Sequence, residues 1–254
     1  MEREEESTIK SDETLFAVVE GIREIDGGRI TDIADHTGIS KSTVYRHAKT
    51  LEKHEFVVER DGEYHLGMRF LDFGGYVRRQ NEAAKQIRPR IERLADETGE
   101  LTAFVVEEYG LGVFVYRGIG SNAVGTDARI GKRFHLHALA AGKAILAELP
   151  RERVDGIVDE HGLPELTAGT ITDRERLHDE LDAVRDRGYA FDRQEHIKGL
   201  NAVATTVHGP DDELLGAVNV AGPSHRMKGD WFEEEIPELL LGVVNEFELD
   251  ITYA

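Results

Sequence analysis

The order of helix and hairpin signals over residues 11–67 restricts the fold more than any other feature of this chain. Apolar residues recur at helical spacing over residues 12–25, and two glycines end that segment. A second, shorter helix is predicted over residues 32–37, where Thr31 stands as its cap and Gly38 supplies a turn. Two helices joined in this way are typical of the first half of a helix-turn-helix.

A third helix and a hairpin complete the pattern. Ser40 is the predicted N-cap of a helix that runs to about His54. Its predicted buried stripe is Val44, Ala48 and Leu51. Two short β-prone runs then flank Asp61 and Gly62, a dipeptide that favours a tight hairpin turn. Helix, short helix, turn, capped helix and hairpin in this order predict a winged helix-turn-helix.

The charge of the chain is strongly negative, with 31 basic and 50 acidic residues and a formal net charge of −19. Dense surface carboxylates keep a protein hydrated at high salt, so we interpret this balance as adaptation to a salt-rich cytoplasm, such as that of a halophilic archaeon. Residues 40–54 reverse the balance, since they hold four basic residues and one acidic residue. Because the local charge at a contact surface decides nucleic-acid binding, this segment predicts a DNA-reading helix.

The predicted DNA contacts follow from the geometry of a helix-turn-helix. The N-terminal part of the third helix lies in the major groove against base edges, while neighbouring side chains bind phosphates. The residues predicted to read bases or phosphates are Ser42, Thr43, Tyr45 and Arg46. Those predicted to position the helix or bind phosphates are Thr31, Ser40, Lys41 and Lys49, and those on the hairpin are Arg60 and His65. An ordinary amphipathic surface helix is the alternative, and the neighbouring helix, turn and hairpin argue against it.

Beyond residue 67 the pattern changes from helical to mixed. Residues 68–98 are predicted to be helical, with interruptions at Gly74, Gly75 and Pro89. Four β-prone runs follow, at residues 101–107, 111–117, 201–208 and 214–220. Between and after them lie predicted helices, over residues 137–148, 151–160, 173–187 and 232–247. Strand pairs separated by helices indicate an α+β fold with an antiparallel sheet.

These patterns divide the chain into four parts. We predict a disordered acidic tail over residues 1–10, the winged helix-turn-helix over 11–67, a connector helix over 68–82 and the α+β domain over 83–254. The chain has no cysteine, which excludes disulfides and thiolate metal sites. No apolar run approaches the length of a membrane span, and the acidic N-terminus lacks the features of a signal peptide. We therefore expect a cytoplasmic protein with no membrane partner.

The segment over residues 31–47 closely resembles the isocitrate-lyase-regulator (IclR) family of transcription factors. The resemblance continues through residues 64–67, 131–147, 188–195 and 216–223, so it covers nearly the whole chain. It implies a GAF-like domain for effector binding and oligomerisation, in a homodimer or a dimer of dimers. It also implies a transcriptional regulator that binds a pseudo-palindromic operator in double-stranded DNA. An organic-acid or aromatic metabolite would modulate this binding, in the control of a catabolic operon.

The resemblance also implies an effector pocket. Matched motif to motif, the expected effector-binding residues are Ala123, Thr126, Phe134, Ala140, Ala141, Asp192, Leu200, Ala202, Asn219 and Ala221. Small residues at the start of a helix let a ligand approach backbone N–H groups, whose partial positive charge suits an anion. The chain departs from the family at Asn219 and Ala221, where small hydroxyl residues are common, and at His135, where proline is frequent.

Two pairs of residues allow other interpretations. Asp192 and Glu195 have the spacing of a general acid/base pair, but we prefer a helix-start carboxylate with a capping partner three residues on. His135 and His137 have the spacing of metal ligands, without a third ligand nearby. We therefore predict no catalytic site, no metal and no cofactor. The alternatives are a small-molecule enzyme fused to a helix-turn-helix, and a winged helix that binds protein; the basic third helix argues against the second.

Overall fold

The structure, a computed structural model, describes residues 8–253, except for the side chain of residue 82. Seven of the ten residues of the predicted acidic tail lie outside the described residues, and the first helix already begins at Lys10. The chain divides into two compact units, with the division between Val77 and Arg78. In the described part of the chain, no helix combines the length and the apolar character that crossing a membrane requires.

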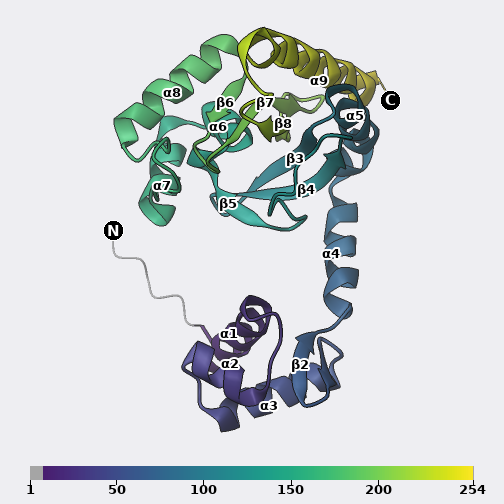
Figure 1. Ribbon diagram of the computed structural model, residues 1–254, viewed down its shortest axis with the longest axis vertical. Helices are drawn as coiled ribbons and strands as arrows, with labels where there is room; N and C mark the ends of the chain where they lie inside the picture. The colour runs from purple at the N-terminus through teal and green to yellow at the C-terminus, as the bar shows by residue number, and fades with distance from the viewer. Residues whose placement is uncertain (1–7, 254) are drawn as a thin grey trace. The chain divides into compact units, whose positions relative to one another are not determined.

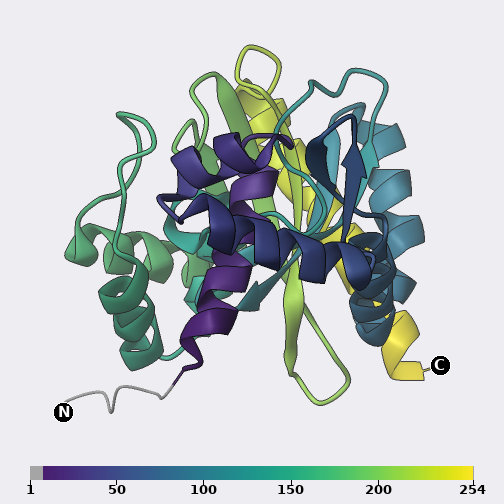
Figure 2. The ribbon, with the colours of Figure 1, turned by 90° about the horizontal axis from the view of Figure 1, so that it is seen from below.

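The N-terminal unit is a three-helix bundle with a hairpin (Figure 1). Its elements are α1 (Lys10–Glu24), α2 (Ile30–Thr37), α3 (Lys41–Lys53), β1 (Val57–Arg60) and β2 (Glu63–Leu66). The three helices and the hairpin enclose one core, which contains Val18, Ile22, Ile33, Val44, Ala48, Leu51 and Tyr64. The predicted stripe of α3 is therefore buried, and the remaining faces of this helix point outward. Figure 2 shows α3 across the front of the unit, with α1 behind it.

The start of α3 has the local geometry that the sequence predicts. Gly38 adopts a left-handed conformation with φ of 70°, and the Ser40 hydroxyl accepts a hydrogen bond from the Thr43 amide at 3.3 Å. The predicted cap of the preceding helix is wrong, because α2 begins at Ile30 and Thr31 lies inside its first turn. There the Asp32 carboxylate accepts the Arg29 amide at 3.0 Å, and a carboxylate caps a helix start more effectively than a hydroxyl one residue earlier.

The hairpin closes in a two-residue turn. Asp61 and Gly62 have φ of 52° and 83°, the positive values that a type I′ turn requires. In the ladder, Val57 pairs with Leu66 and Arg60 pairs with Glu63. Tyr64 also exchanges backbone hydrogen bonds with Gly28, at 2.8 and 3.2 Å, and this bridge fixes the hairpin to the segment before α2.

Two helices follow the hairpin, α4 (Arg69–Gln80) and α5 (Glu82–Thr98). The predicted interruptions at Gly74, Gly75 and Pro89 are wrong, since the glycine pair lies inside α4 and the proline inside α5. A glycine costs a helix only about 1 kcal/mol, which neighbouring residues offset. The break is at Asn81, whose side-chain oxygen accepts the Ala84 amide at 2.8 Å and so starts a new helix.

The C-terminal unit contains a six-stranded antiparallel sheet in the order β5-β4-β3-β8-β7-β6. Its strands are β3 (Leu101–Glu108), β4 (Leu111–Ile119), β5 (Arg133–His135), β6 (Ala190–Arg193), β7 (Leu200–His208) and β8 (Leu214–Pro223). The four central strands and the α+β class were predicted from the sequence, and both are confirmed. The edge strands β5 and β6 were missed because three or four residues are too few to show an alternating pattern.

Helices cover both faces of this sheet (Figure 1). The helices are α6 (Ala140–Glu148), α7 (Arg151–His161), α8 (Arg174–Arg187) and α9 (Ile236–Tyr253), with a single turn of 3₁₀-helix at Leu136–Ala138 and a π-helical turn at Trp231–Glu235. One apolar core lies between the sheet and α6 to α8, and it contains many alanines, among them Ala103, Ala204 and Ala217. The other core, between the sheet and α5 with α9, contains larger side chains such as Phe104 and Phe232. The small residues of the first core leave room on that face of the sheet.

Candidate nucleic-acid interface and ligand pocket

The outward face of α3 carries most of the residues predicted to contact DNA. Ser40, Lys41, Ser42, Tyr45 and Arg46 are exposed, and half of the Tyr45 surface is open to solvent. The Ser40 hydroxyl lies 3.2 Å from that of Ser42 and 2.9 Å from that of Thr43, so the helix start presents a cluster of hydroxyl groups. Hydroxyls and backbone amides at a helix start are suited to phosphate oxygens.

Two cations on this face have no acidic partner among the described residues. Lys41 and Arg46 are both exposed, and neither takes part in an ion pair or side-chain hydrogen bond within the described chain. The Arg46 guanidinium therefore keeps all of its donors for another molecule. In a chain of net charge −19, two unpaired cations beside exposed hydroxyls form a local site for an anion.

Lys49 differs from its neighbours on α3. Its Nζ donates to Glu52 at 2.8 Å and to Glu59 of β1 at 2.9 Å, and the Tyr64 hydroxyl donates to the same Glu59 carboxylate at 3.0 Å. The hydrogen bonds to Glu52 and Glu59 raise the pKa of Lys49. The ammonium group thus ties α3 to the hairpin, and a phosphate would have to compete with two carboxylates for it.

The other predicted contacts are spread around the unit. Thr31 is exposed in the first turn of α2, where its hydroxyl donates to Asp32 at 3.3 Å. Arg60 is exposed at the end of β1, next to the turn of the hairpin. His65 is half-buried and packs so closely on the backbone of Gly27 that a Cβ there would lie 2.0 Å from its Nδ1. The structure therefore leaves Arg60 open to solvent and turns His65 inward.

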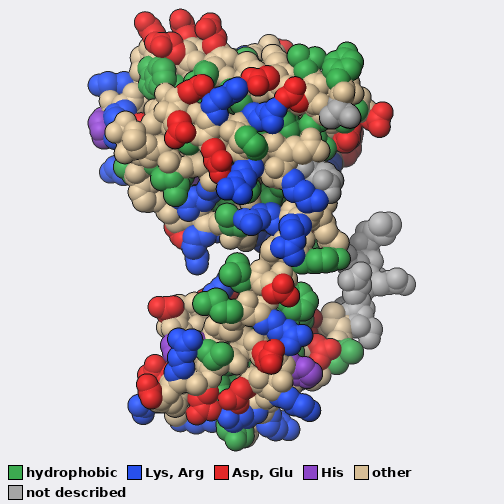
Figure 3. All heavy atoms as spheres, turned by 90° about the vertical axis from the view of Figure 1, so that its right-hand side faces the viewer, with side chains coloured by type: hydrophobic (Ala, Val, Ile, Leu, Met, Phe, Trp, Pro, Cys, Tyr) green, Lys and Arg blue, Asp and Glu red, His purple; other side chains and the backbone are tan. Residues whose placement is uncertain are grey.

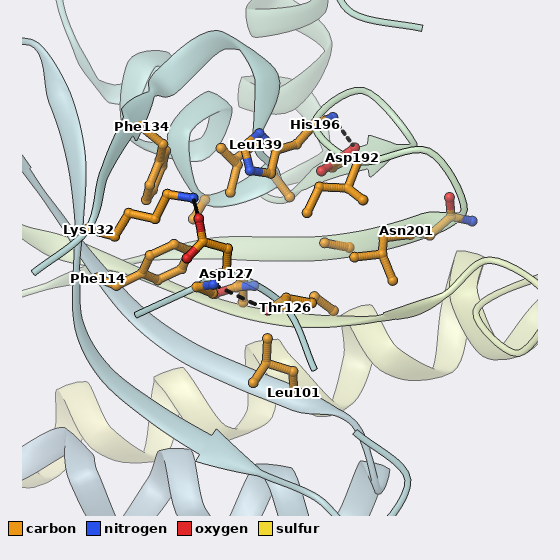
Figure 4. Close-up of a pocket in the computed structure, with 18 residues that line it drawn as sticks. Leu101, Phe114, Thr126, Asp127, Lys132, Phe134, Leu139, Asp192, His196 and Asn201 are labelled. Carbon is orange, nitrogen blue, oxygen red and sulfur yellow. Dashed lines mark hydrogen bonds and ion pairs between the residues drawn. The ribbon is translucent and has the colours of Figure 1, made fainter. Parts of the chain in front are cut away.

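The C-terminal unit contains a pocket of about 640 Å³, part of it open to solvent, on the alanine-rich face of the sheet (Figure 4). Nine of the ten residues predicted to bind an effector line it: Thr126, Phe134, Ala140, Ala141, Asp192, Leu200, Ala202, Asn219 and Ala221. Ala123 is not among the lining residues, and its amide donates to Gly120 in the preceding turn at 3.1 Å.

The two ends of the pocket differ in character. Figure 4 shows Phe114 and Phe134 at one end, with their ring centroids 4.8 Å apart, and Asp192 toward the other end. Lys132 forms an ion pair with Asp127 at 2.5 Å beside the aromatic end. The aromatic rings offer apolar contact area, while the opposite end offers hydrogen-bonding groups.

Asp192 is the buried acid of the polar end. Its carboxylate accepts the Glu195 amide at 2.7 Å and the His196 amide at 3.4 Å. Burial, and then the nearby charge of Glu195, raise the pKa of Asp192 to about 7. The interpretation as a helix-start carboxylate is wrong, because Asp192 is in strand β6 and the amides that it accepts belong to a turn. Its acceptor role is the same, since a turn leaves free N–H groups much as a helix start does.

A buried ion pair supports this turn from below. Lys143 of α6 is 1% exposed, and its Nζ donates to the two carboxylate oxygens of Glu195 at 2.6 and 2.8 Å. The sequence analysis assigned no role to Lys143, although a lysine inside an otherwise apolar helical segment signals a buried partner. The pair fixes the backbone amide of Glu195, and that amide holds Asp192.

Several polar groups around the pocket have no partner. The Asn219 Oδ1 and the His196 Nδ1 are both buried without a hydrogen bond in the described chain. Helix α6 begins at Ala140 without a side-chain cap, so the first backbone amides of this helix also have no side-chain acceptor. Buried polar atoms without partners are unfavourable, and a bound molecule with both donors and acceptors would satisfy them.

The two histidines that raised the question of a metal differ in their contacts. His137 Nε2 lies 3.2 Å from the Pro164 carbonyl, whereas the buried His135 Nδ1 has no hydrogen-bond partner among the described residues. Burial lowers the pKa of both His135 and His137. Among the described residues, no group of histidine and carboxylate side chains has an arrangement that could hold a metal ion.

Comparison with known proteins places both units in one family. The model of the IclR helix-turn-helix domain matches residues 15–61, and that of the bacterial transcriptional regulator IclR C-terminal domain matches residues 76–246, more than half of the chain. The chain is 28% identical over 242 residues to the probable HTH-type transcriptional regulator ArcR of Halobacterium salinarum, covering 93% of this chain and 92% of that protein.

Two solved structures show the same architecture. The crystal structure of the Thermotoga maritima IclR superposes with a TM-score of 0.75 at 25% identity, covering 96% of this chain and 98% of the other. The inducer-binding domain of the Acinetobacter PobR transcription factor, a double mutant in complex with 3-hydroxybenzoic acid, superposes with a TM-score of 0.61 at 28% identity. This match covers 65% of this chain and 96% of that domain.

Proposed function

The chain belongs to the IclR family of transcriptional regulators, and from this premise we propose that it binds an operator through α3 and releases or retains it in response to a small organic acid. The observation that carries the proposal is the outward face of α3, where Lys41 and Arg46 have no acidic partner within the described chain. We assign base contacts to Ser42, Thr43, Tyr45 and Arg46. We assign phosphate contacts to Thr31, Ser40, Lys41 and Arg60.

The structure changes the roles that we assign to two of the residues predicted to contact DNA. Lys49 is held by Glu52 and Glu59, so we assign it a role in joining α3 to the hairpin, with phosphate binding only if those ion pairs open. His65 packs against Gly27, so we assign the contact of the hairpin with DNA to Arg60. Exposed ion pairs are weak, so the pairs of Lys49 with Glu52 and Glu59 can open and leave Lys49 free to bind a phosphate.

We propose that the pocket of the C-terminal unit binds the effector. Phe114 and Phe134 would take an aromatic or apolar body, and the first amides of α6 would take a carboxylate. The Asn219 Oδ1 needs a donor, which a hydroxyl group on the ligand supplies. The 3-hydroxybenzoic acid bound by the PobR domain has all three features, and we propose a hydroxylated organic acid for this chain.

We further propose that the protein works as a homodimer, or as a dimer of dimers, joined in part through the N-terminal unit. An open apolar groove of this unit is lined by Leu15, Phe16, Val19, Thr50, Leu51, His54, Phe56 and Phe70. Phe16, which lines this groove, is 67% exposed. Solvent exposure of an apolar groove is unfavourable, and the same surface of a second copy would cover it in a two-fold dimer.

We propose regulation, rather than catalysis, for the C-terminal unit. The carboxylates that could form an acid/base pair are both engaged, Asp192 by backbone amides and Glu195 by Lys143. The relatives are named transcriptional regulators, and the alternative of a fused enzyme has no further observation in its favour. We propose a cytoplasmic location, where operator DNA is found, and a salt-rich cytoplasm in view of the charge of −19.

A gel shift tests the function as a whole. The full-length protein is titrated against the DNA upstream of its own gene in high KCl, with an unrelated duplex of equal length as control. Preferential binding of the upstream DNA is expected, and it should change when 3-hydroxybenzoate or another hydroxylated acid is added. Equal binding of both duplexes would contradict operator recognition.

Sedimentation of Phe16→Ser beside the wild type tests the dimer, with partial dissociation expected for the variant.

A further inference from the structure

A second basic surface lies outside the helix-turn-helix. Residues 78–88 contain four basic residues and one acidic residue, the same balance as residues 40–54, in a chain where acids far outnumber bases. Arg78 lies in the last turn of α4 and Arg88 lies on α5, and their guanidinium carbons lie 5.6 and 5.4 Å from the ring centroid of Tyr116 on β4. Figure 3 shows Lys and Arg side chains gathered over this face of α4 and α5.

The arginines on the two sides of α5 have different acidic partners. On the side toward α9, Arg90 pairs with Asp250, and Arg93 with Glu246 at 2.7 Å. These acids neutralise that side. On the other side, Arg88 pairs with Glu92 at 2.8 Å on its own helix, while Arg78 and Arg79 have no acidic partner among the described residues. Among the described residues around α5, excess positive charge therefore remains where α4 ends and α5 begins.

We propose that Arg78 and Arg88, held against the ring of Tyr116, form with the neighbouring Arg79 a second phosphate-binding surface that contacts operator DNA outside the bases read by α3. This surface is called the Tyr116 cluster below. Guanidinium groups fit phosphate oxygens, and stacking on a tyrosine ring fixes their direction in advance. Residues 67–77 are the only chain between the end of the hairpin and Arg78, so a protein bound through α3 brings this cluster to the same DNA molecule. The proposal rests on the proposed function, since it extends the contact with DNA.

Duplex length and salt dependence test this proposal. The core duplex is the shortest one that binds the wild-type full-length protein, and the long duplex adds about one helical turn, roughly ten base pairs, at each end. Binding to both is measured over a range of KCl concentrations for the wild type, for Arg78→Ala/Arg79→Ala/Arg88→Ala, and for a control. The control is Arg151→Ala/Arg153→Ala/Arg176→Ala, which removes the same charge from exposed positions on α7 and α8.

The wild type and the control are expected to bind the long duplex more tightly than the core duplex, with a steeper salt dependence. The variant of the Tyr116 cluster should lose this gain, and the slope of log K against log salt should become shallower by about 0.9 for each phosphate contact removed. Its binding to the core duplex should match the control, which also shows that it is folded. Replacing the three arginines by lysine should keep most of the slope, because the charge remains.

Other results would overturn the proposal. Equal gain and slope in the variant and the control would show that the Tyr116 cluster does not contact DNA. Weaker binding of the core duplex, together with a changed sedimentation coefficient, would assign the cluster to contacts between subunits. If the wild type bound the core duplex but gained nothing from the long one, this proposal would fail and the operator function would remain. If no duplex from the upstream region bound the wild type, so that no core duplex could be defined, both would fail.

Discussion

The cations of α3 that are assigned to DNA binding are at the surface, whereas the charged groups at the polar end of the ligand pocket, Lys143, Asp192 and Glu195, are buried. Arg46 is exposed and without an acidic partner in the described chain, while Lys143 is 1% exposed and its ammonium contacts both oxygens of Glu195. A surface cation contributes little to folding and keeps its interaction energy for a ligand. A buried ion pair fixes the shape of a site, and its loss destabilises the fold. The same kind of residue thus serves binding on α3 and shape at the pocket.

The largest effect is expected at the buried pair. Lys143→Met leaves the Glu195 carboxylate buried and unpaired, which should reduce the free energy of unfolding by about 3–5 kcal/mol. Lys143→Met/Glu195→Gln removes the unpaired charge and should regain part of the loss. Arg151→Ala, which breaks the exposed pair with Glu175, is the control and should cost about 0–1 kcal/mol. Urea denaturation of the full chain measures all three, and equal losses for Lys143→Met and Arg151→Ala would remove the distinction drawn above.

At the surface cation the pattern should be reversed. Arg46→Ala should weaken operator binding by about 1–3 kcal/mol and relax the sequence preference, because a guanidinium that reads a base is lost. Its denaturation curve should overlay that of the wild type. Arg176→Ala, another exposed arginine, serves as the control for charge and should bind the operator normally. Unchanged affinity and sequence preference in Arg46→Ala would refute base reading by this residue.

Both kinds of charge were open to prediction, but to different degrees. The helix-turn-helix is defined by local signals, such as the Ser40 cap, the Gly38 turn and the Asp61–Gly62 hairpin, and each acts within a few residues. The pair of Lys143 and Glu195 joins residues that are 52 positions apart, and the sequence around each residue does not indicate which residue it pairs with. The lining of the pocket was predicted from family resemblance, since small residues alone indicate no cavity. The excess of base over acid in residues 78–88 was overlooked, although it can be counted in the sequence.

Two departures from what the sequence suggests have the same physical origin. Interruptions were predicted at Gly74 and Gly75 because glycine disfavours helices, yet Asn81 ends α4 by offering its side chain to the Ala84 amide. Lys49 was predicted to contact phosphate, and in the structure Glu59 of the hairpin lies 2.9 Å from its ammonium group. In both cases a specific hydrogen bond outweighed an average tendency of the residue type.

A titration in the pocket sharpens the contrast between the units. Because the pKa of Asp192 is raised from 3.8 to about 7, its contribution to stability is complete below about pH 4 and is lost as the pH rises through 7. Between about pH 4 and pH 7, the Asp192 carboxyl should lower the free energy of unfolding by up to about 1.4 kcal/mol for each unit by which the pH rises. Asp192→Asn keeps an acceptor for the Glu195 amide and should remove this slope. Denaturation at pH 5, 6, 7 and 8 measures it, and parallel curves for both proteins would show that Asp192 is ionised throughout.

The smallest effect is expected in the helix that joins the two units. A Cβ at Gly74 meets no other atom within 4 Å, so alanine fits there. Gly74→Ala/Gly75→Ala should stiffen α4, by about 1 kcal/mol of helix stability for each residue. We expect this to reduce the response of operator binding to the effector more than it changes binding without effector. Equal changes in both quantities would show that the glycine pair is not a hinge.

The central claim is that the outward face of α3 meets DNA, and crosslinking tests it most directly. A photoreactive amino acid replaces Tyr45 on α3 or, as the control, Tyr109, which is 76% exposed in the C-terminal unit. After irradiation with operator DNA, the protein labelled at Tyr45 should attach to bases inside the protected site, and the protein labelled at Tyr109 should give no adduct. Attachment from Tyr109 with none from Tyr45, at equal occupancy of the DNA, would contradict the account.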